Sequence, residues 1–165
     1  MSRRRVSISN LHPRLRVDRA AVVRALRALD GGSPPLARPG SAADGSGDLS
    51  LVFLTDAALA ELHSTFLGDP SVTDVITFDH SDAPSAGMAG EICVSADAAA
   101  RRAGRGAARS SRLSLEITLY MVHGWLHLAG HDDLEPARKR AMRRAEARAL
   151  RRLRTLGLVP RFVLR

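Results

Sequence analysis

Hydrophobic and polar residues alternate along this chain in patterns that predict both strands and helices. Four short stretches have the alternation or the β-branched residues of strands: 6–9, 49–54, 72–78 and 90–95. Four others predict helices from hydrophobic spacing or a preceding capping residue: 18–30, 56–66, 96–103 and 136–156. A longer, almost unbroken hydrophobic run, Leu113 to Ala129, predicts a buried helix. This order of elements predicts an α+β fold, in which helices pack on a small mixed sheet of about four strands.

Several residues indicate where the helices begin and which side faces the core. Asp18 and Ser95 have the short polar side chains that cap helix N-termini, and Pro136 suits the first turn of the last helix. The residues of that last helix that we expect to face the core are Met142, Ala145, Ala149, Leu153 and Leu156.

The length and composition favour one globular domain over residues 1–165, with 45% hydrophobic residues. Residues 31–47, rich in Gly, Pro, Ser and Ala, predict a flexible loop within that domain. The single cysteine, Cys93, excludes an internal disulfide and suits a reducing cytoplasm. No hydrophobic stretch follows Arg3–Arg5 as in a signal peptide, and the longest hydrophobic run is too short for a bilayer. We therefore expect a soluble, cytoplasmic protein with no membrane partner.

The end of the buried helix carries the strongest candidate site. His123 and His127 are four residues apart, so their rings project from one face of a helix and can share a metal ion. Gly130 then allows a left-handed turn that brings the chain back towards them. A third ligand is available from the residues that follow: His131, Asp132 or Asp133.

Three protein ligands leave one position for water, which is the arrangement of catalytic rather than structural zinc sites. A single histidine on a hydrophobic face is usually a core residue, but the pair, the glycine and a third ligand together favour a metal site. Imidazole and carboxylate ligands suit zinc best, although nickel, iron and manganese bind similar ligands.

Positive charge is concentrated beside this site. The net charge of the chain is +8, and the segment from Leu134 to Arg165 has eleven Lys or Arg residues against Glu135 and Glu146, or +9. A basic surface of this kind favours a polyanion such as RNA, although a solvated arginine-rich helix face has the same composition. The residues that we expect to contact RNA are Arg101, Arg102, Arg140 and Arg144.

The histidine stretch resembles the signature of the YbeY family of endoribonucleases, His-Gly-x-Leu-His-Leu-x-Gly-x-Asp-His. It matches at every fixed position except the last, where this chain has Asp133. Residues 62–78 resemble a second signature of the family, Leu-Asn-x-x-Tyr-Arg-x-x-Asp-x-Pro-Thr-Asp-Val-Leu-Ser-Phe. Matching residues there are Thr73, Asp74, Val75 and Phe78. The spacing agrees from Leu49 to about Gly157, so the resemblance covers most of the chain.

This resemblance implies a zinc-dependent endoribonuclease that cuts single-stranded RNA, matures the 3′ end of 16S rRNA and acts in ribosome biogenesis. It also implies the small ribosomal subunit as a partner, with contacts to a ribosomal protein or an assembly GTPase. The three histidine ligands of the family map onto His123, His127 and Asp133, and an aspartate oxygen ligates zinc at about the same distance as a histidine nitrogen. His131 falls at a position that does not ligate in the family.

Two departures from the family predict weaker catalysis. Leu67 replaces an arginine that is thought to contact the RNA phosphate, and leucine cannot neutralise its charge. If Asp133 ligates, the metal site is one unit less positive, so a bound water is a weaker acid. We therefore expect a weak or differently tuned nuclease.

The catalytic residues that we expect are His123, through the metal, and Asp132. The sequence does not identify the general base, for which Asp132 and Glu91 are candidates on residue type alone. Two other functions stay open. A ribosome-assembly factor that binds RNA around a structural metal would fit the two departures. A metallopeptidase of the metzincin kind has the same histidine spacing, but Gly124 replaces its general-base glutamate and cannot accept a proton.

Overall fold

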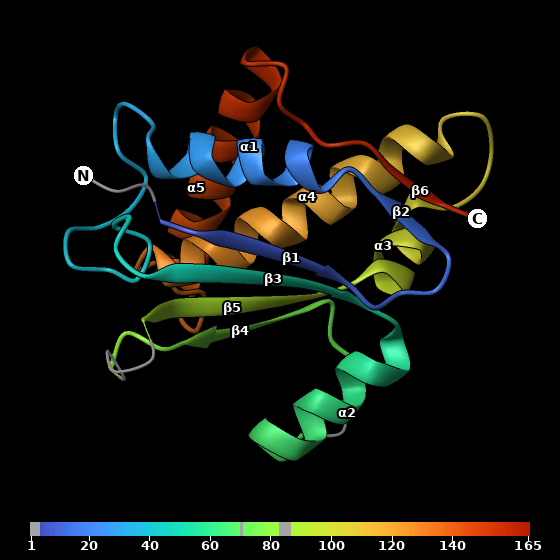
Figure 1. Ribbon diagram of the computed structural model, residues 1–165, viewed down its shortest axis with the longest axis horizontal. Helices are drawn as coiled ribbons and strands as arrows, with labels where there is room; N and C mark the ends of the chain where they lie inside the picture. The colour runs from blue at the N-terminus through green and yellow to red at the C-terminus, as the bar shows by residue number, and fades with distance from the viewer. Residues whose placement is uncertain (1–3, 70, 83–86) are drawn as a thin grey trace.

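A four-stranded mixed sheet forms the centre of the protein in the computed structural model, which describes residues 4–69, 71–82 and 87–165 (Figure 1). The strand order is β1-β3-β5-β4. Strands β1 (Val6–Asn10), β3 (Asp48–Leu54) and β5 (Met88–Ser95) are parallel, and β4 (Val75–Asp79) runs antiparallel to β5 at the edge. The predicted α+β class and mixed sheet are confirmed.

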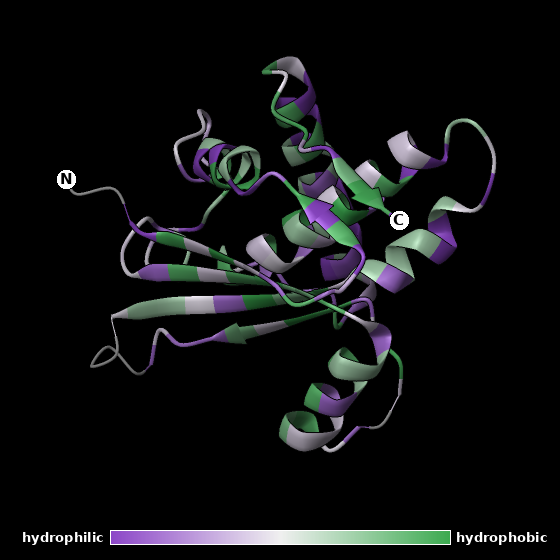
Figure 2. Cartoon of the chain, turned by 45° about the vertical axis from the view of Figure 1, so that its right-hand side comes forward, coloured by the Kyte–Doolittle hydropathy of each residue, from purple (hydrophilic) through white to green (hydrophobic). Residues whose placement is uncertain are grey.

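Five helices accompany the sheet: α1 (Arg19–Asp30), α2 (Asp56–Leu67), α3 (Ala96–Ala103), α4 (Arg109–Leu128) and α5 (Pro136–Thr155). The larger core joins one face of the sheet to α1, α4 and α5, and hydrophobic residues recur along the strands (Figure 2). On the opposite face, Leu59 of α2 packs in a smaller cluster with Leu54, Ile76 and Cys93.

Local capping explains where several helices begin. The side chains of Asp18, Thr55 and Ser95 accept hydrogen bonds from the backbone N–H groups of Ala21, Ala58 and Ala98. Each bond satisfies a donor that has no partner within its own helix. The predicted caps at Asp18 and Ser95 are confirmed.

One predicted strand boundary and one predicted core residue are wrong. The strand predicted from residue 72 begins at Val75, since its partner β5 ends at Ser95, whose N–H already bonds the Asp74 carbonyl. The side chain of Leu156, predicted to face the core, is 56% exposed. Helix α5 ends one residue earlier, and the chain turns away at Gly157, where φ is +65°.

A second, two-stranded sheet was not predicted. It pairs β2 (Leu15–Val17) with β6 (Phe162–Leu164) in antiparallel register. Three-residue strands are too short to show a period of two, and they are fixed here by tertiary contacts. The buried ring of Phe162 packs edge-on against Phe53 at a centroid distance of 5.4 Å.

Residues 31–47 form no helix or strand, in agreement with the predicted loop. The loop nevertheless contributes buried side chains to the main core: Leu36, Ala42 and Ala43. Its backbone also donates to the end of α4, from Arg38 N to the Ala129 carbonyl (2.9 Å) and from Ala43 N to the Leu128 carbonyl (3.0 Å). A segment from early in the chain therefore satisfies carbonyls that the helix terminus leaves free.

Candidate metal centre

The C-terminal half of α4 lies unusually close to the sheet. A Cβ atom on Gly124 would lie 2.5 Å from Ile92 Cγ2 and 3.0 Å from Thr77 Oγ1. Real Cβ atoms do not approach other atoms so closely, so glycine is required for this packing. The close approach fixes the neighbouring His123 and His127 above the edge strand β4.

The chain reverses directly after α4. Gly130 has φ of +89°, a left-handed value that glycine adopts without strain, and the N–H of His131 bonds the Leu126 carbonyl at 3.0 Å. The predicted turn at Gly130 is confirmed. It returns the next residues towards the two histidine rings.

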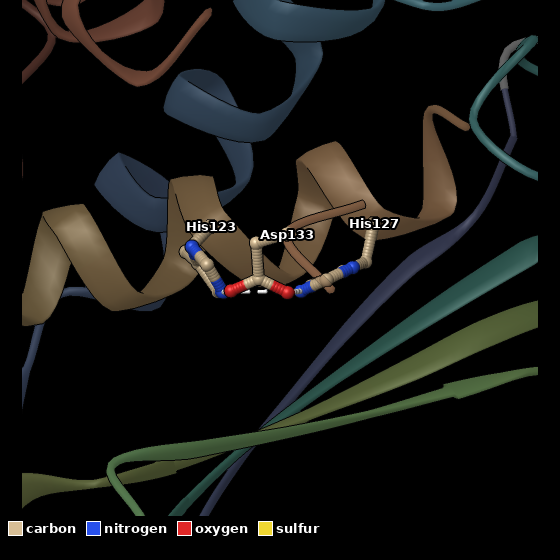
Figure 3. Close-up of side chains that lie close together, drawn as sticks. All are labelled: His123, His127 and Asp133. Atoms are coloured by element: carbon tan, nitrogen blue, oxygen red, sulfur yellow. Dashed lines mark hydrogen bonds and ion pairs between the residues drawn. The ribbon is translucent and has the colours of Figure 1, made fainter. Parts of the chain in front are cut away.

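Three side chains converge at this turn: His123, His127 and Asp133 (Figure 3). The Nε2 atoms of the two histidines are 3.0 Å apart. One carboxylate oxygen of Asp133 lies 3.7 Å from His123 Nε2, and the other lies 3.7 Å from His127 Nε2. All three side chains are partly buried.

This arrangement fits a zinc ion. Two ligand atoms that each lie about 2.1 Å from a tetrahedral ion are about 3.4 Å from one another. The separations of 3.0 and 3.7 Å lie on either side of that value. Only small side-chain movements would therefore be needed to place all three ligands around one ion.

Glu146 orients one of these rings from α5. Its Oε1 atom lies 2.6 Å from His123 Nδ1, so the carboxylate accepts a hydrogen bond from the Nδ1–H group and leaves the Nε2 lone pair facing His127 and Asp133. This role of Glu146 was not predicted from the sequence. A signal was present, because Glu146 is the sole acidic residue in the sequence of an otherwise basic helix.

The environment favours neutral His127, which is the form that binds metals. Burial lowers the pKa of the His127 imidazole, and the adjacent His123 ring lowers it further, against the opposing effect of Asp133. The ring is therefore ready to ligate without first losing a proton.

The other two candidates for the third ligand point elsewhere. His131 places its Nε2 atom 3.0 Å from the carbonyl oxygen of Leu36. The carboxylate of Asp132 accepts hydrogen bonds from Leu134 N (3.1 Å) and Arg138 Nη1 (2.6 Å). The Leu134 N–H holds the pKa of Asp132 below its usual value, and Arg138 adds to that effect. A low pKa makes Asp132 a weak proton acceptor.

A hollow of about 510 Å³ opens beside the two histidines, between α2, β4 and the end of α4. Leu67 lines it and is 59% exposed, so the residue that replaces the family's arginine does face this space. The remaining lining residues include His63, Thr77, Asp79 and Asp132. The hollow therefore brings both resembling segments to one place.

The predicted RNA contacts are distributed over two regions. Arg101 is paired with Asp56, the first residue of α2, and Arg102 is exposed beside it on α3. Arg140 is exposed on α5, and Arg144 lines a second hollow together with His131. These four contacts stay predictions.

Glu91, the second candidate base, is not among the residues that line the hollow. Its carboxylate lies 3.8 Å from the sulfur of buried Cys93. Burial, with a smaller contribution from Glu91, raises the pKa of the Cys93 thiol to about 12, so this thiol is an inert part of the core.

A family model described as Endoribonuclease YbeY matches residues 37–154. The chain belongs to the YbeY family. This match includes the whole histidine stretch and Glu146.

Curated YbeY relatives agree with this assignment. The Endoribonuclease YbeY of Anaeromyxobacter dehalogenans is 37% identical over 105 residues, which is 63% of this chain and 53% of the relative. That of Chlamydia abortus is 40% identical over 105 residues, or 62% of this chain and 66% of the relative. The matched part of the chain thus spans about half the length of the first relative and about two thirds of the second.

The fold is also similar to a solved structure. The solution structure of TM1509 from Thermotoga maritima superposes with a TM-score of 0.53 at 18% identity, covering 90% of this chain and 88% of that one. Within the described residues, no helix combines the length and the hydrophobicity needed to cross a membrane.

Proposed function

We propose that this YbeY protein is a zinc-dependent endoribonuclease that cleaves single-stranded RNA. The observation that supports it best is the convergence of His123, His127 and Asp133, with an open hollow beside the two histidines. Three ligands and free space beside them are characteristic of catalytic rather than structural zinc sites. When bound, zinc activates a water molecule and polarises a phosphoryl oxygen.

The side chains around the site have separate proposed roles. Glu146 orients His123 through the Nδ1 proton, and His127 is held in its neutral form. Asp132 is proposed as the proton acceptor, at the low driving force that its lowered pKa implies. Arg101, Arg102, Arg140 and Arg144 are proposed to attract the RNA backbone.

We expect the activity to be weak compared with relatives that retain the arginine and the third histidine. Leu67 leaves the hollow without a cation at that position, and losing one charge-stabilising contact costs on the order of a hundredfold in rate. Asp133 further reduces the positive charge of the site.

The biological role that we propose follows the family resemblance. It is maturation of the 3′ end of 16S rRNA in the cytoplasm, during assembly of the small ribosomal subunit. The chain's net charge of +8 supports RNA as its partner.

The main alternative is a ribosome-assembly factor that binds RNA around a structural metal. The lowered pKa of Asp132 and the uncharged Leu67 favour it. A metallopeptidase is disfavoured on geometry, because a side chain at Gly124 would collide with Ile92 and no glutamate fits there.

One experiment separates these functions. Wild-type protein, His123→Ala and His80→Ala are compared for zinc content, cleavage of a fluorescent single-stranded RNA, RNA affinity and far-UV circular dichroism. His80 is a matched control, since it does not line the hollow. We expect His123→Ala to lose zinc and at least a hundredfold in cleavage rate, while fold and RNA affinity persist.

Two results of this experiment would count against the nuclease proposal. If His123→Ala unfolds the protein, the metal is structural and the assembly factor is favoured. If the wild-type protein binds zinc and RNA but leaves the RNA intact, the nuclease proposal fails.

A further inference from the structure

Two hollows lie end to end along α5, on the side of the helix away from Glu146. One, of about 660 Å³, lies between α5, the end of α1 and the loop at 31–36. The other, of about 420 Å³, lies between α5, Arg38 and His131. Arg148 and Arg151 line both hollows, so the two adjoin along α5, and we describe them together as one groove.

This groove leads to the metal centre. His131 lines the smaller hollow and also the hollow that contains His123 and His127. The groove and the metal hollow therefore adjoin at one residue. A ligand held at the metal can continue past His131 into the groove without leaving the surface.

The groove is strongly and uniformly basic. We name it the arginine groove after the six residues that line it: Arg27, Arg38, Arg144, Arg148, Arg151 and Arg152. Its described lining contains no acidic residue and no Phe, Tyr or Trp. Asp30, which lies close by, is occupied by hydrogen bonds from Arg4 Nε and Trp125 Nε1, each at 2.9 Å.

Another hollow with several arginines shows the contrast. The hollow at the α3–α4 junction has four arginines but also Asp56 and Asp97 in its wall. Asp56 is already paired with Arg101. The positive charge of that hollow is partly neutralised, whereas the charge of the arginine groove is not.

One arginine of the groove is held in place by the loop at 31–36. Arg152 Nη2 donates to the Pro34 carbonyl at 2.6 Å, and its guanidinium lies against Gly32, where a Cβ would be 1.5 Å from Nη1. Nη1 is buried and finds no hydrogen-bond partner among the described residues. Arg152 is therefore a fixed part of the groove wall, and its charge adds to the positive potential of the groove.

We propose that the arginine groove holds the single-stranded RNA that continues beyond the cleavage point. This proposal rests on the proposed nuclease function and adds the path of its substrate. From Arg144 to Arg152, α5 rises about 12 Å. That length matches three to four phosphates of a stacked strand at about 3.4 Å each. With no Phe, Tyr or Trp for base stacking, the groove binds the backbone and selects little for sequence.

The test compares two triple variants of the same helix. The groove variant is Arg144→Gln, Arg148→Gln and Arg151→Gln. The control is Lys139→Gln, Arg143→Gln and Arg154→Gln, which removes the same charge from exposed residues that do not line the groove. Glutamine has a helix propensity close to that of arginine and lysine, so both variants should fold.

Binding of a single-stranded RNA of about 20 nucleotides, which is long enough to fill the groove, is measured over a salt titration. The measurement uses the His123→Ala background, because this substitution prevents cleavage. The groove variant should weaken binding about tenfold or more and reduce the salt slope by about 2, because each single-strand phosphate contact contributes about 0.7. The control variant should change affinity far less. Equal losses of RNA affinity in the two variants would show that the overall positive charge attracts the RNA. That result would overturn the proposal that RNA lies in the arginine groove.

Two further arms identify the partner and separate this proposal from the nuclease function. With zinc-loaded protein, the groove variant should raise KM for the same RNA and leave kcat unchanged. If no variant cleaves RNA, the nuclease proposal fails while the affinity difference still decides the groove. If the groove variant keeps its RNA affinity and instead loses binding to anionic lipid vesicles, a membrane surface is the partner and the RNA path is wrong.

Discussion

The carboxylate of Glu146 shows how one residue outside the ligand set can control a metal centre. It fixes the proton on His123 Nδ1 and so directs the lone pair of Nε2 towards the other ligands. The same contact raises the electron density of the ring and strengthens it as a ligand. Zinc affinity should therefore depend on a residue that never touches the metal.

Replacing Glu146 by Ala should weaken zinc binding about ten- to a hundredfold, and Glu146→Gln should have a smaller effect because the amide oxygen can still accept a hydrogen bond from the Nδ1–H group. Competition with a chromophoric chelator measures the affinity. Glu135→Gln, an exposed acid at the start of α5, is the control. Unchanged zinc affinity in Glu146→Ala would show that the contact only supports packing.

Leu67 gives a second prediction for a single residue. Since its side chain lines the metal hollow, Leu67→Arg places a cation where phosphate charge is expected, and kcat/KM for RNA cleavage should rise by up to about a hundredfold. Leu11→Arg adds the same charge to an exposed leucine after β1, the edge strand opposite β4, and should have little effect. Equal rates in both variants would exclude Leu67 as the cause of weak activity.

Helix α4 acts as one rigid element because it packs against the sheet through a glycine. In Gly124→Ala, the new methyl group would meet Ile92 and Thr77, and such overpacking typically costs about 1–3 kcal/mol. The better helix propensity of alanine offsets up to about 1 kcal/mol. We expect a net loss of about 1–2 kcal/mol in the free energy of unfolding by urea, together with weaker zinc binding.

Ser111→Ala is the matched control, at an exposed position near the start of the same helix. It lacks the collision and should leave the unfolding free energy within about 0.5 kcal/mol of wild type. If Gly124→Ala were as stable as this control, α4 would have room to move away from β4.

At the scale of elements, the sequence predicted those parts whose cause is local. Caps at Asp18 and Ser95 and the hydrophobic run into α4 each depend on neighbouring residues, and each was confirmed. The true start of β4 depends on where β5 ends, and the pairing of β2 with β6 joins the two ends of the chain. Neither can be read from a local pattern.

At the scale of the whole molecule, local patterns again predicted one part of the candidate site, and the part that depends on tertiary packing was not predicted. The spacing of His123 and His127, with the turn at Gly130, predicted a site with a third ligand from residues 131–133, and the family resemblance selected Asp133, which does lie beside the two histidines. The contact with Glu146 was not predictable, because it depends on how α5 packs beside α4. The arginine groove likewise requires residues from α1, the early loop and α5 to meet.

The tie between Trp125, Asp30 and Arg4 has a consequence for how such proteins diverge. Both Asp30 and Arg4 precede residue 37, where the match to the family model begins. Helix α4, which carries the histidine motif, is thus supported by residues that lie outside the region matched by the family model. Natural variation in those residues can shift the reactive end of the helix while every diagnostic residue stays the same, so two members with identical motifs need not share one rate or one preferred RNA.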